Sequence, residues 1–251
     1  MKTLVLQVCV SLVRAAFAVM ALRAARSMRP WENQQRLSWM ATGITFAVYA
    51  AVMLAQDYFS VRAYFAGIES PVYAFYRHFS PVVEHARTFL MFGFYGALLA
   101  LPFRERWSTR AWWTGFAVAL VATGVLGAVA GFVEGSLTGQ HFINTAYLDI
   151  VGFAVLGTTL FVSMYRDSMD RYLWTAIAIY GFTSIAGVLY LTTTSWFMSD
   201  DWRPPSWQRP LVAVIMGVAM TALAYRRWRL ARRGVPVQGL MPELRTRPML
   251  G

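Results

Sequence analysis

The sequence predicts an all-α membrane protein, a single bundle of seven transmembrane helices with its amino terminus outside the cell and its carboxyl terminus in the cytoplasm. Three observations lead to this prediction: a shortage of charge, seven apolar runs of spanning length, and arginines gathered on one side. Of the 251 residues, 57% are hydrophobic and only 14% are charged, whereas a soluble domain carries about 25% charged residues. Much of the predicted surface therefore faces hydrocarbon.

Seven apolar runs divide the chain, and each approaches the roughly 20 residues that a helix needs to cross a bilayer. A lone span must be helical, because lipid offers no partners for its backbone polar groups. Proline, glycine or charge marks each break, as at Ser80-Pro81 and at residues 135–139. We expect a membrane domain over residues 1–230 and a short basic cytoplasmic tail over residues 231–251. The predicted helices are residues 3–22, 38–56, 85–102, 112–133, 146–165, 172–192 and 210–226.

The placement of arginine gives the orientation, since short loops rich in basic residues stay in the cytoplasm. The net charge of +11 predicts contacts with anionic lipid headgroups rather than with nucleic acid, because the basic residues lie at helix ends. Residues 1–18 also resemble a signal peptide, but cleavage there would leave the first span too short to cross. The side assigned to the cytoplasm carries Arg23, Arg26, Arg29, Arg36, Arg104, Arg106, Arg110, Arg166, Arg171, Arg226, Arg227, Arg229, Arg232 and Arg233.

Six polar residues form a candidate site. Arg14 is expected near the middle of the first span, where an arginine costs about 2.5–3.5 kcal/mol on insertion scales and normally finds a partner. No acidic residue is visible at its depth, so we favour a structural role for it. Glu84 and Arg87 can pair, because three residues separate them on one helix. The others form either an outer polar pocket or structural ion pairs, which we favour: Glu84, His85, Arg87, Glu134 and Asp149.

No pattern in the sequence predicts a metal site or an enzyme. The three histidines, His78, His85 and His141, fall in loops or at helix ends. Their spacing fits neither a closed zinc site nor haem ligands on facing helices. The single cysteine, Cys9, excludes an intrachain disulfide. We also find no nucleophile with a neighbouring base inside the predicted spans, and we therefore expect no catalysis.

One stretch of the first cytoplasmic loop and second span carries a more specific pattern. Trp31 precedes the sequence Thr42-Gly43-Ile44-Thr45-Phe46, and Arg87 opens the third span. This pattern resembles the proteorhodopsin branch of the microbial rhodopsins. The resemblance implies the same seven-helix bundle in a bacterial cytoplasmic membrane, self-association in a ring, and a β-hairpin within the long outer segment of residues 58–83.

The resemblance ends at the pigment chemistry. Rhodopsins hold retinal as a Schiff base on a lysine of the seventh helix, and that position falls near Gly217. Arginine cannot replace the lysine because it stays charged, and Lys2, the only lysine, lies at the chain end. A light-driven pump is therefore excluded. The family's other pump and pocket positions fall near Val48, Leu90, Met91, Leu101, Phe182, Ala186 and Ala213.

We therefore expect a lysine-less, opsin-like protein without covalent retinal, acting as a structural, sensory or partner-binding module. Its expected partners are the lipid bilayer, further copies of itself, and a membrane or cytoplasmic protein. One alternative is an accessory subunit of a larger membrane complex. The other alternative is a carrier or channel for a small apolar ligand, such as carotenoid or free retinal held without a covalent bond. Its pocket would be left by the small residues Gly93, Gly96, Ala186, Gly187, Ala213 and Gly217.

Overall fold

The computed structural model describes residues 2–101, 107–138, 145–166, 169–182 and 207–237, and every regular element within these ranges is a helix. The all-α prediction is thus confirmed for this part of the chain. Within the described residues, each of the seven predicted spans overlaps a helix, and residues 183–192 of the sixth lie outside them. The helices are α1 (Lys2–Ser27), the short 3-10 helix η1 (Pro30–Glu32), α2 (Asn33–Ala66), α3 (Pro71–Leu98), α4 (Thr109–Thr138), α5 (Thr145–Arg166), a helical segment over residues 171–182, and α7 (Gln208–Arg232).

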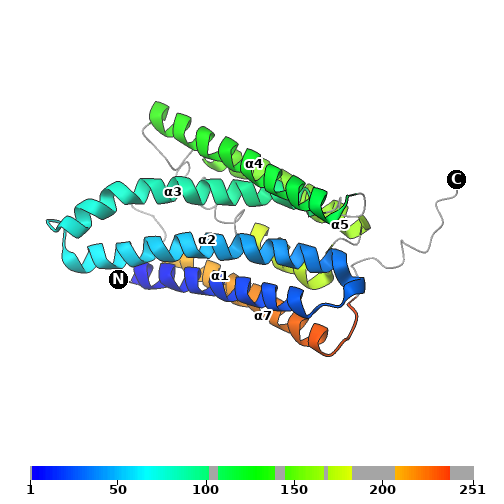
Figure 1. Cartoon of the computed structure of the whole chain (residues 1–251). Helices are drawn as coiled ribbons and strands as arrows, with labels where there is room; N and C mark the ends of the chain where they lie inside the picture. The colour runs from blue at the N-terminus through cyan, green and yellow to red at the C-terminus, as the bar shows by residue number, and fades with distance from the viewer. Residues whose placement is uncertain (1, 102–106, 139–144, 167–168, 183–206, 238–251) are drawn as a thin grey trace.

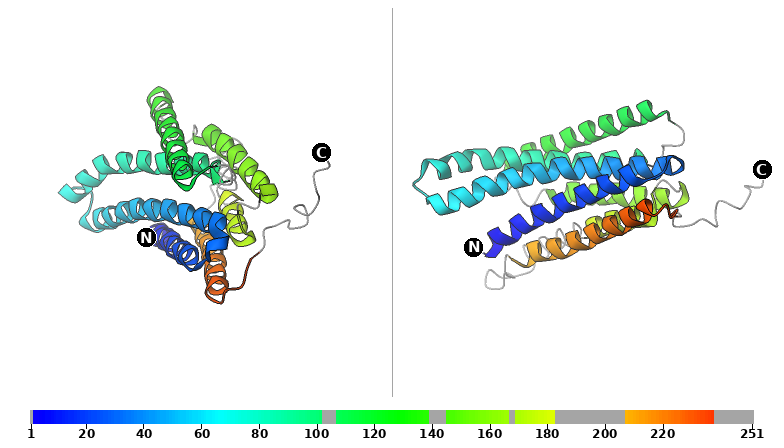
Figure 2. Two further views of the ribbon diagram at one scale, coloured as in Figure 1. Left: turned by 45° about the vertical axis from the view of Figure 1, so that its right-hand side comes forward. Right: turned by 60° about the horizontal axis from the view of Figure 1, so that its bottom comes forward.

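The long helices run side by side along one direction (Figure 1). Helix α1 lies between α2 and α7, and α3 packs against α2, α4 and α5 (Figure 2). Four helices are long and apolar enough to cross a membrane, and these stretches are Thr3–Ser27, Pro30–Ala66, Thr109–Val129 and Pro210–Arg232. The chain is therefore a multi-pass helical membrane protein.

The outer segment between the second and third spans differs from the expectation. Helix α2 continues for 34 residues to Ala66, or about 50 Å at 1.5 Å per residue, well beyond the roughly 30 Å of hydrocarbon. A turn with Gly67 at φ +83° and Ser70 as N-cap then starts α3 at Pro71. The β-hairpin implied for residues 58–83 is wrong, because both flanks stay helical. This helical hairpin projects past the amino end of α1 in Figure 1.

Two predicted breaks also lie inside helices. Pro81 lies within α3, so the break expected at Ser80-Pro81 is wrong. Helix α4 continues to Thr138, through most of the break expected at residues 135–139. The breaks expected at Pro102 and at residues 204–205 lie outside the described residues.

Aromatic side chains fill the interior where α1, α2, α3 and the 171–182 segment meet. The ring of Phe46 packs edge to face against those of Phe17, Phe94 and Tyr180, with centroids 4.8, 5.3 and 5.2 Å away. Such pairs contribute about 0.5–1.5 kcal/mol each beyond the area they bury. We call these four rings the aromatic core. It holds together α1, α2, α3 and the 171–182 segment.

Glycines bring α3 and α4 into close contact. A Cβ atom at Gly96 would lie 2.1 Å from Thr123 Oγ1, and one at Gly93 would lie 2.7 Å from the Leu120 carbonyl oxygen. On the opposite side, Gly124 faces the backbone of α3 just as closely. The small residues of α4 therefore serve packing inside the bundle, as small-residue interfaces do in membranes.

Candidate functional site

Two buried polar clusters lie between the helices. The first, the Arg227 cluster, consists of Glu32, Gln35, Trp39, Asp170 and Arg227, at the end of the bundle that carries the arginine-rich loops. The second, the Arg14 cluster, lies between α1, α2 and α3. It consists of Ser11, Arg14, Tyr49, Asp57 and Arg87. Only the second was anticipated in part from the sequence.

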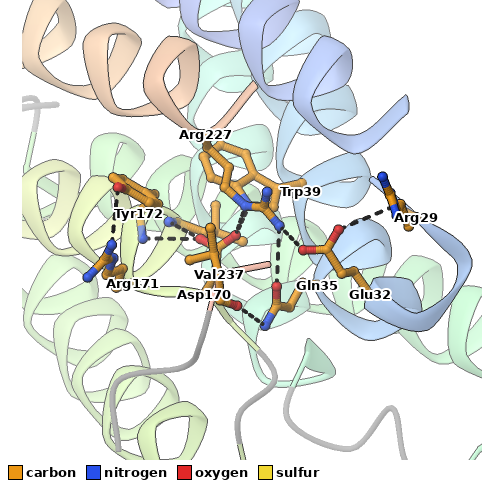
Figure 3. Close-up of polar contacts among 10 residues, drawn as sticks. Arg29, Glu32, Gln35, Trp39, Asp170, Arg171, Tyr172, Arg227 and Val237 are labelled. Carbon is orange, nitrogen blue, oxygen red and sulfur yellow. Dashed lines mark hydrogen bonds and ion pairs between the residues drawn. The ribbon is translucent and has the colours of Figure 1, made fainter. Parts of the chain in front are cut away.

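Arg227 is the centre of the first cluster, and its side chain is fully buried. Its Nε donates to Asp170 Oδ2 at 2.5 Å, and its Nη2 donates to Glu32 Oε1 at 2.5 Å (Figure 3). The same Nη2 lies 3.5 Å from Gln35 Oε1. One guanidinium from α7 thus pairs with a carboxylate at the start of α2 and with another just before the 171–182 segment.

Asp170, also fully buried, joins three elements. Its Oδ2 accepts a hydrogen bond from Trp39 Nε1 at 2.9 Å in addition to the one from Arg227. Its Oδ1 accepts from the backbone amides of Tyr172 and Leu173 at 3.1 and 2.9 Å, which is the geometry of a helix N-cap. The aspartate therefore starts the 171–182 helix and fixes that helix to α2 and α7.

The chain after α7 folds back onto this cluster. Gly234 has φ +69°, and the amides of Gly234 and Val235 donate to the carbonyls of Ala231 and Leu230 at 3.0 and 3.1 Å. This is a Schellman motif, in which glycine takes the left-handed conformation after the helix end. Val237 is consequently buried, and its carbonyl accepts from Gln35 Nε2 at 3.5 Å.

The chemistry open to the Arg227 cluster is structural. Both carboxylates are engaged by the guanidinium, and Asp170 is further engaged by an indole and two amides. No group of three or more potential metal ligands occurs among the described residues. Removing one partner of a buried ion pair costs about 3–5 kcal/mol, because the other charge stays buried without compensation. The arrangement therefore clamps helix ends together.

In the Arg14 cluster, Arg14 meets an aromatic partner. Its Nη1 lies 3.3 Å from Tyr49 Oη, and its guanidinium carbon lies 4.8 Å from the centroid of the Tyr49 ring. Arg87, from α3, approaches the same hydroxyl. Nearby, Ser11 Oγ donates to Asp57 Oδ2 at 2.5 Å, and both residues are buried. The two arginines thus face a tyrosine and, at longer range, one aspartate.

The structure brings together part of the predicted site. Arg14 and Arg87 converge on Tyr49, and His85, two residues before Arg87 in α3, is partly buried. The side chains of Glu84, Glu134 and Asp149 lie outside the part of the structure described. The outer pocket expected from these residues therefore stays a prediction.

Three functional groups were missed at the sequence level. Asp57 stands one residue beyond the predicted second span, so it was not weighed as an acid near Arg14. Asp170 lies between two predicted spans and Arg227 one residue beyond the predicted seventh span, so neither was weighed as a site residue. One local signal could have found Asp170, because an aspartate immediately before a helical run is a favoured N-cap. No local pattern shows that Arg227 points inward. Five of its neighbours in the sequence are exposed, namely Tyr225, Arg226, Arg229, Arg232 and Arg233.

A small cavity lies between α2, α3 and the 171–182 segment. Its volume is about 10 Å³, which suffices for about one water molecule. The glycines expected to leave a pocket are instead in contact with neighbours: Gly93 and Gly96 face α4, and a Cβ at Gly217 would lie 2.7 Å from Val13 Cγ1. Ala186 and Gly187 lie outside the described residues. The cavity is lined by Thr45, Phe46, Tyr49, Leu90, Met91, Phe94 and Tyr180.

No protein-family model, curated protein or solved structure matches the chain. The comparisons therefore identify no microbial rhodopsin. The resemblance of residues 26–49 to that family supports only a proposal.

Proposed function

We propose that this chain is a lysine-less, opsin-like protein of seven membrane spans that acts as a structural, sensory or partner-binding module without covalent retinal. Its amino terminus is outside and its carboxyl terminus is in the cytoplasm of a bacterium, with the bundle in the cytoplasmic membrane. It is neither a light-driven pump nor an enzyme. We further expect self-association and a membrane or cytoplasmic protein partner.

The observation that supports this proposal most is the close packing of the described residues beside the positions aligned with the chromophore. The cavity beside Leu90 and Met91 measures about 10 Å³, whereas pockets for small molecules measure about 300–1,000 Å³. Gly217, the position aligned with the retinal lysine, packs against Val13 of α1. The only lysine of the chain is Lys2. A covalent chromophore would thus lack its amine, and the described residues leave little space for it.

The buried charges also favour a static role. A proton pump needs titratable groups in series across the membrane, and the aligned positions near Leu90, Leu101 and Ala213 are apolar. The buried Arg227 pairs with Asp170 and Glu32. A clamp of this kind keeps helix ends in fixed positions, which suits a module that presents a surface to a partner.

Retinal reconstitution tests the proposal. The protein is expressed with all-trans-retinal in the medium, purified in mild detergent, and treated with borohydride to trap any Schiff base as a stable amine. We expect the intact mass of the denatured chain to be that of the unmodified sequence and the visible spectrum to lack a protein-shifted band. A trapped retinyl adduct would refute the proposal. Pigment or another apolar molecule that co-purifies without an adduct would instead favour the carrier alternative.

A further inference from the structure

Two exposed arginines lie against one buried tyrosine at the arginine-rich end of the bundle. The guanidinium carbon of Arg171 lies 5.1 Å from the centroid of the Tyr172 ring, and that of Arg226 lies 5.8 Å from the same centroid. Arg171 Nη2 is also 3.4 Å from Tyr172 Oη. Tyr172 is itself only 5% exposed, so the ring is a fixed platform for two exposed cations from different helices.

The Arg227 cluster fixes the position of both arginines. Arg171 directly follows Asp170 in the sequence, and Arg226 directly precedes Arg227. The buried Asp170–Arg227 pair, at 2.5 Å, therefore links the two segments that carry them, as the side-chain contact in Figure 3 shows. The proximity of the two exposed cations is a built feature of the fold rather than a result of side-chain flexibility.

The charge of this arginine pair has no partner in the described structure. The nearest acid in sequence, Asp170, is already engaged by Arg227, Trp39 and two backbone amides, and no ion pair joins Arg171 or Arg226 to a described carboxylate. Arg171 also stands in the first turn of a helix, where the helix dipole disfavours a cation. Like charges brought together at such a place favour an external anion.

A guanidinium that stacks on a ring keeps its N–H donors free, because stacking uses the face and the donors lie along the edge. Those donors match the oxygens of a phosphate group. We propose that Arg171 and Arg226, supported by Tyr172, form a binding site for the phosphate of an anionic lipid headgroup. Trp174 and Trp228 follow each arginine closely in sequence, and tryptophan favours the headgroup level of the bilayer. This depth assigns the phosphate to a lipid.

The test compares two double variants of equal charge. Arg171→Gln with Arg226→Gln removes the pair, whereas Arg229→Gln with Arg232→Gln removes two exposed arginines of α7 that each stack on a different ring, at 5.9 and 5.3 Å. Binding of phosphatidylglycerol to the purified protein is titrated by native mass spectrometry. Phosphatidylcholine and inorganic phosphate serve as separate arms, and circular dichroism confirms that both variants fold.

We expect one phosphatidylglycerol to bind with higher affinity than the rest, and the Arg171/Arg226 variant to bind it about 30-fold more weakly, as the loss of two basic residues at a lipid surface implies. The Arg229/Arg232 variant should keep that affinity within about threefold. Equal losses in both variants would overturn the proposal, because they would show diffuse attraction. Equal binding of phosphatidylcholine would overturn it too, and competition by millimolar phosphate would overturn the assignment to lipid.

A third variant, Tyr172→Leu, tests the platform itself. It keeps both cations but removes the ring on which they stack, so it should also weaken phosphatidylglycerol binding, and Tyr172→Phe should restore most of it. A Tyr172→Leu protein that is folded and binds like the parent would show that the tyrosine does not organise the site.

Discussion

At the residue scale, single buried polar groups decide how the helix ends are held. Asp170 accepts four hydrogen bonds from three elements, and Arg227 has no exposed surface through which water could replace a lost partner. Substituting such a side chain lowers the free energy of unfolding strongly, because the remaining charge stays buried without a partner that offsets its desolvation. The exposed arginines around it lack this property.

The Asp170→Asn substitution is expected to destabilise the protein by about 3–5 kcal/mol, since it leaves Arg227 with one carboxylate, whereas the helix cap is kept because asparagine caps as well as aspartate. Denaturant-induced unfolding in detergent measures the change. Arg232→Gln, on the exposed side of α7, provides the control and should stay within about 0.5 kcal/mol of the parent. A stable Asp170→Asn protein would contradict the assignment of the Arg227 cluster as a clamp.

The contact of Arg14 with Tyr49 separates into two parts that mutation can distinguish. Tyr49→Phe removes the hydroxyl but keeps the ring below the guanidinium, so we expect a loss of about 1 kcal/mol. Tyr49→Leu also removes the ring and should cost about 1–2 kcal/mol more. Equal unfolding free energies for the two variants would show that the ring face contributes nothing to Arg14.

The sequence predicts the candidate site only where the depth of a charged residue in its apolar run is enough to show that it needs a partner. Arg14 was expected to find a partner because it lies deep in an apolar run, and it does. The inward direction of Arg227 and the burial of Asp57 depend on how helices rotate about their axes, which the pattern of charges along the chain does not fix. Tertiary packing settles these orientations.

At the element scale, the helix ends are less predictable than the helices. The described parts of all seven apolar runs are helical, because a backbone in lipid must satisfy its own polar groups. Outside the hydrocarbon that constraint disappears, and the resemblance suggested a β-hairpin where the structure has two helix ends. Pro81 looked like a break, yet α3 continues through it, as membrane helices tolerate when neighbours satisfy the freed carbonyl.

The glycines of α3 and α4 give a prediction about helix packing. Gly96→Ala places a methyl group where Thr123 Oγ1 now lies, so the helices must separate, and we expect a loss of about 1–3 kcal/mol. Gly157→Ala on α5 meets nothing within 4 Å and should be neutral or stabilise by up to about 1 kcal/mol. Thermal unfolding of the two variants measures the contrast, and the same sign for both would contradict close α3–α4 packing.

At the scale of the whole molecule, the two polar clusters and the aromatic core lie along one bundle. The Arg227 cluster joins the start of α2 to the end of α7, the aromatic core joins α1 to the 171–182 segment, and the Arg14 cluster joins α1 to α2. Contacts between segments so distant in sequence make the fold one cooperative unit, and they place the arginine-rich surface at a single end.

The central claim is that this chain is a multi-pass bundle whose Arg227 end lies in the cytoplasm, and labelling of single cysteines from either side of the membrane tests it most directly. In a Cys9→Ser background, cysteines are placed at the exposed positions Ile68, Ser108 and Val235. We predict that an impermeant maleimide added to intact cells labels only Ile68→Cys. Ser108→Cys and Val235→Cys should react only after the membrane is opened. Labelling of Ile68→Cys and Val235→Cys from the same side would contradict the account.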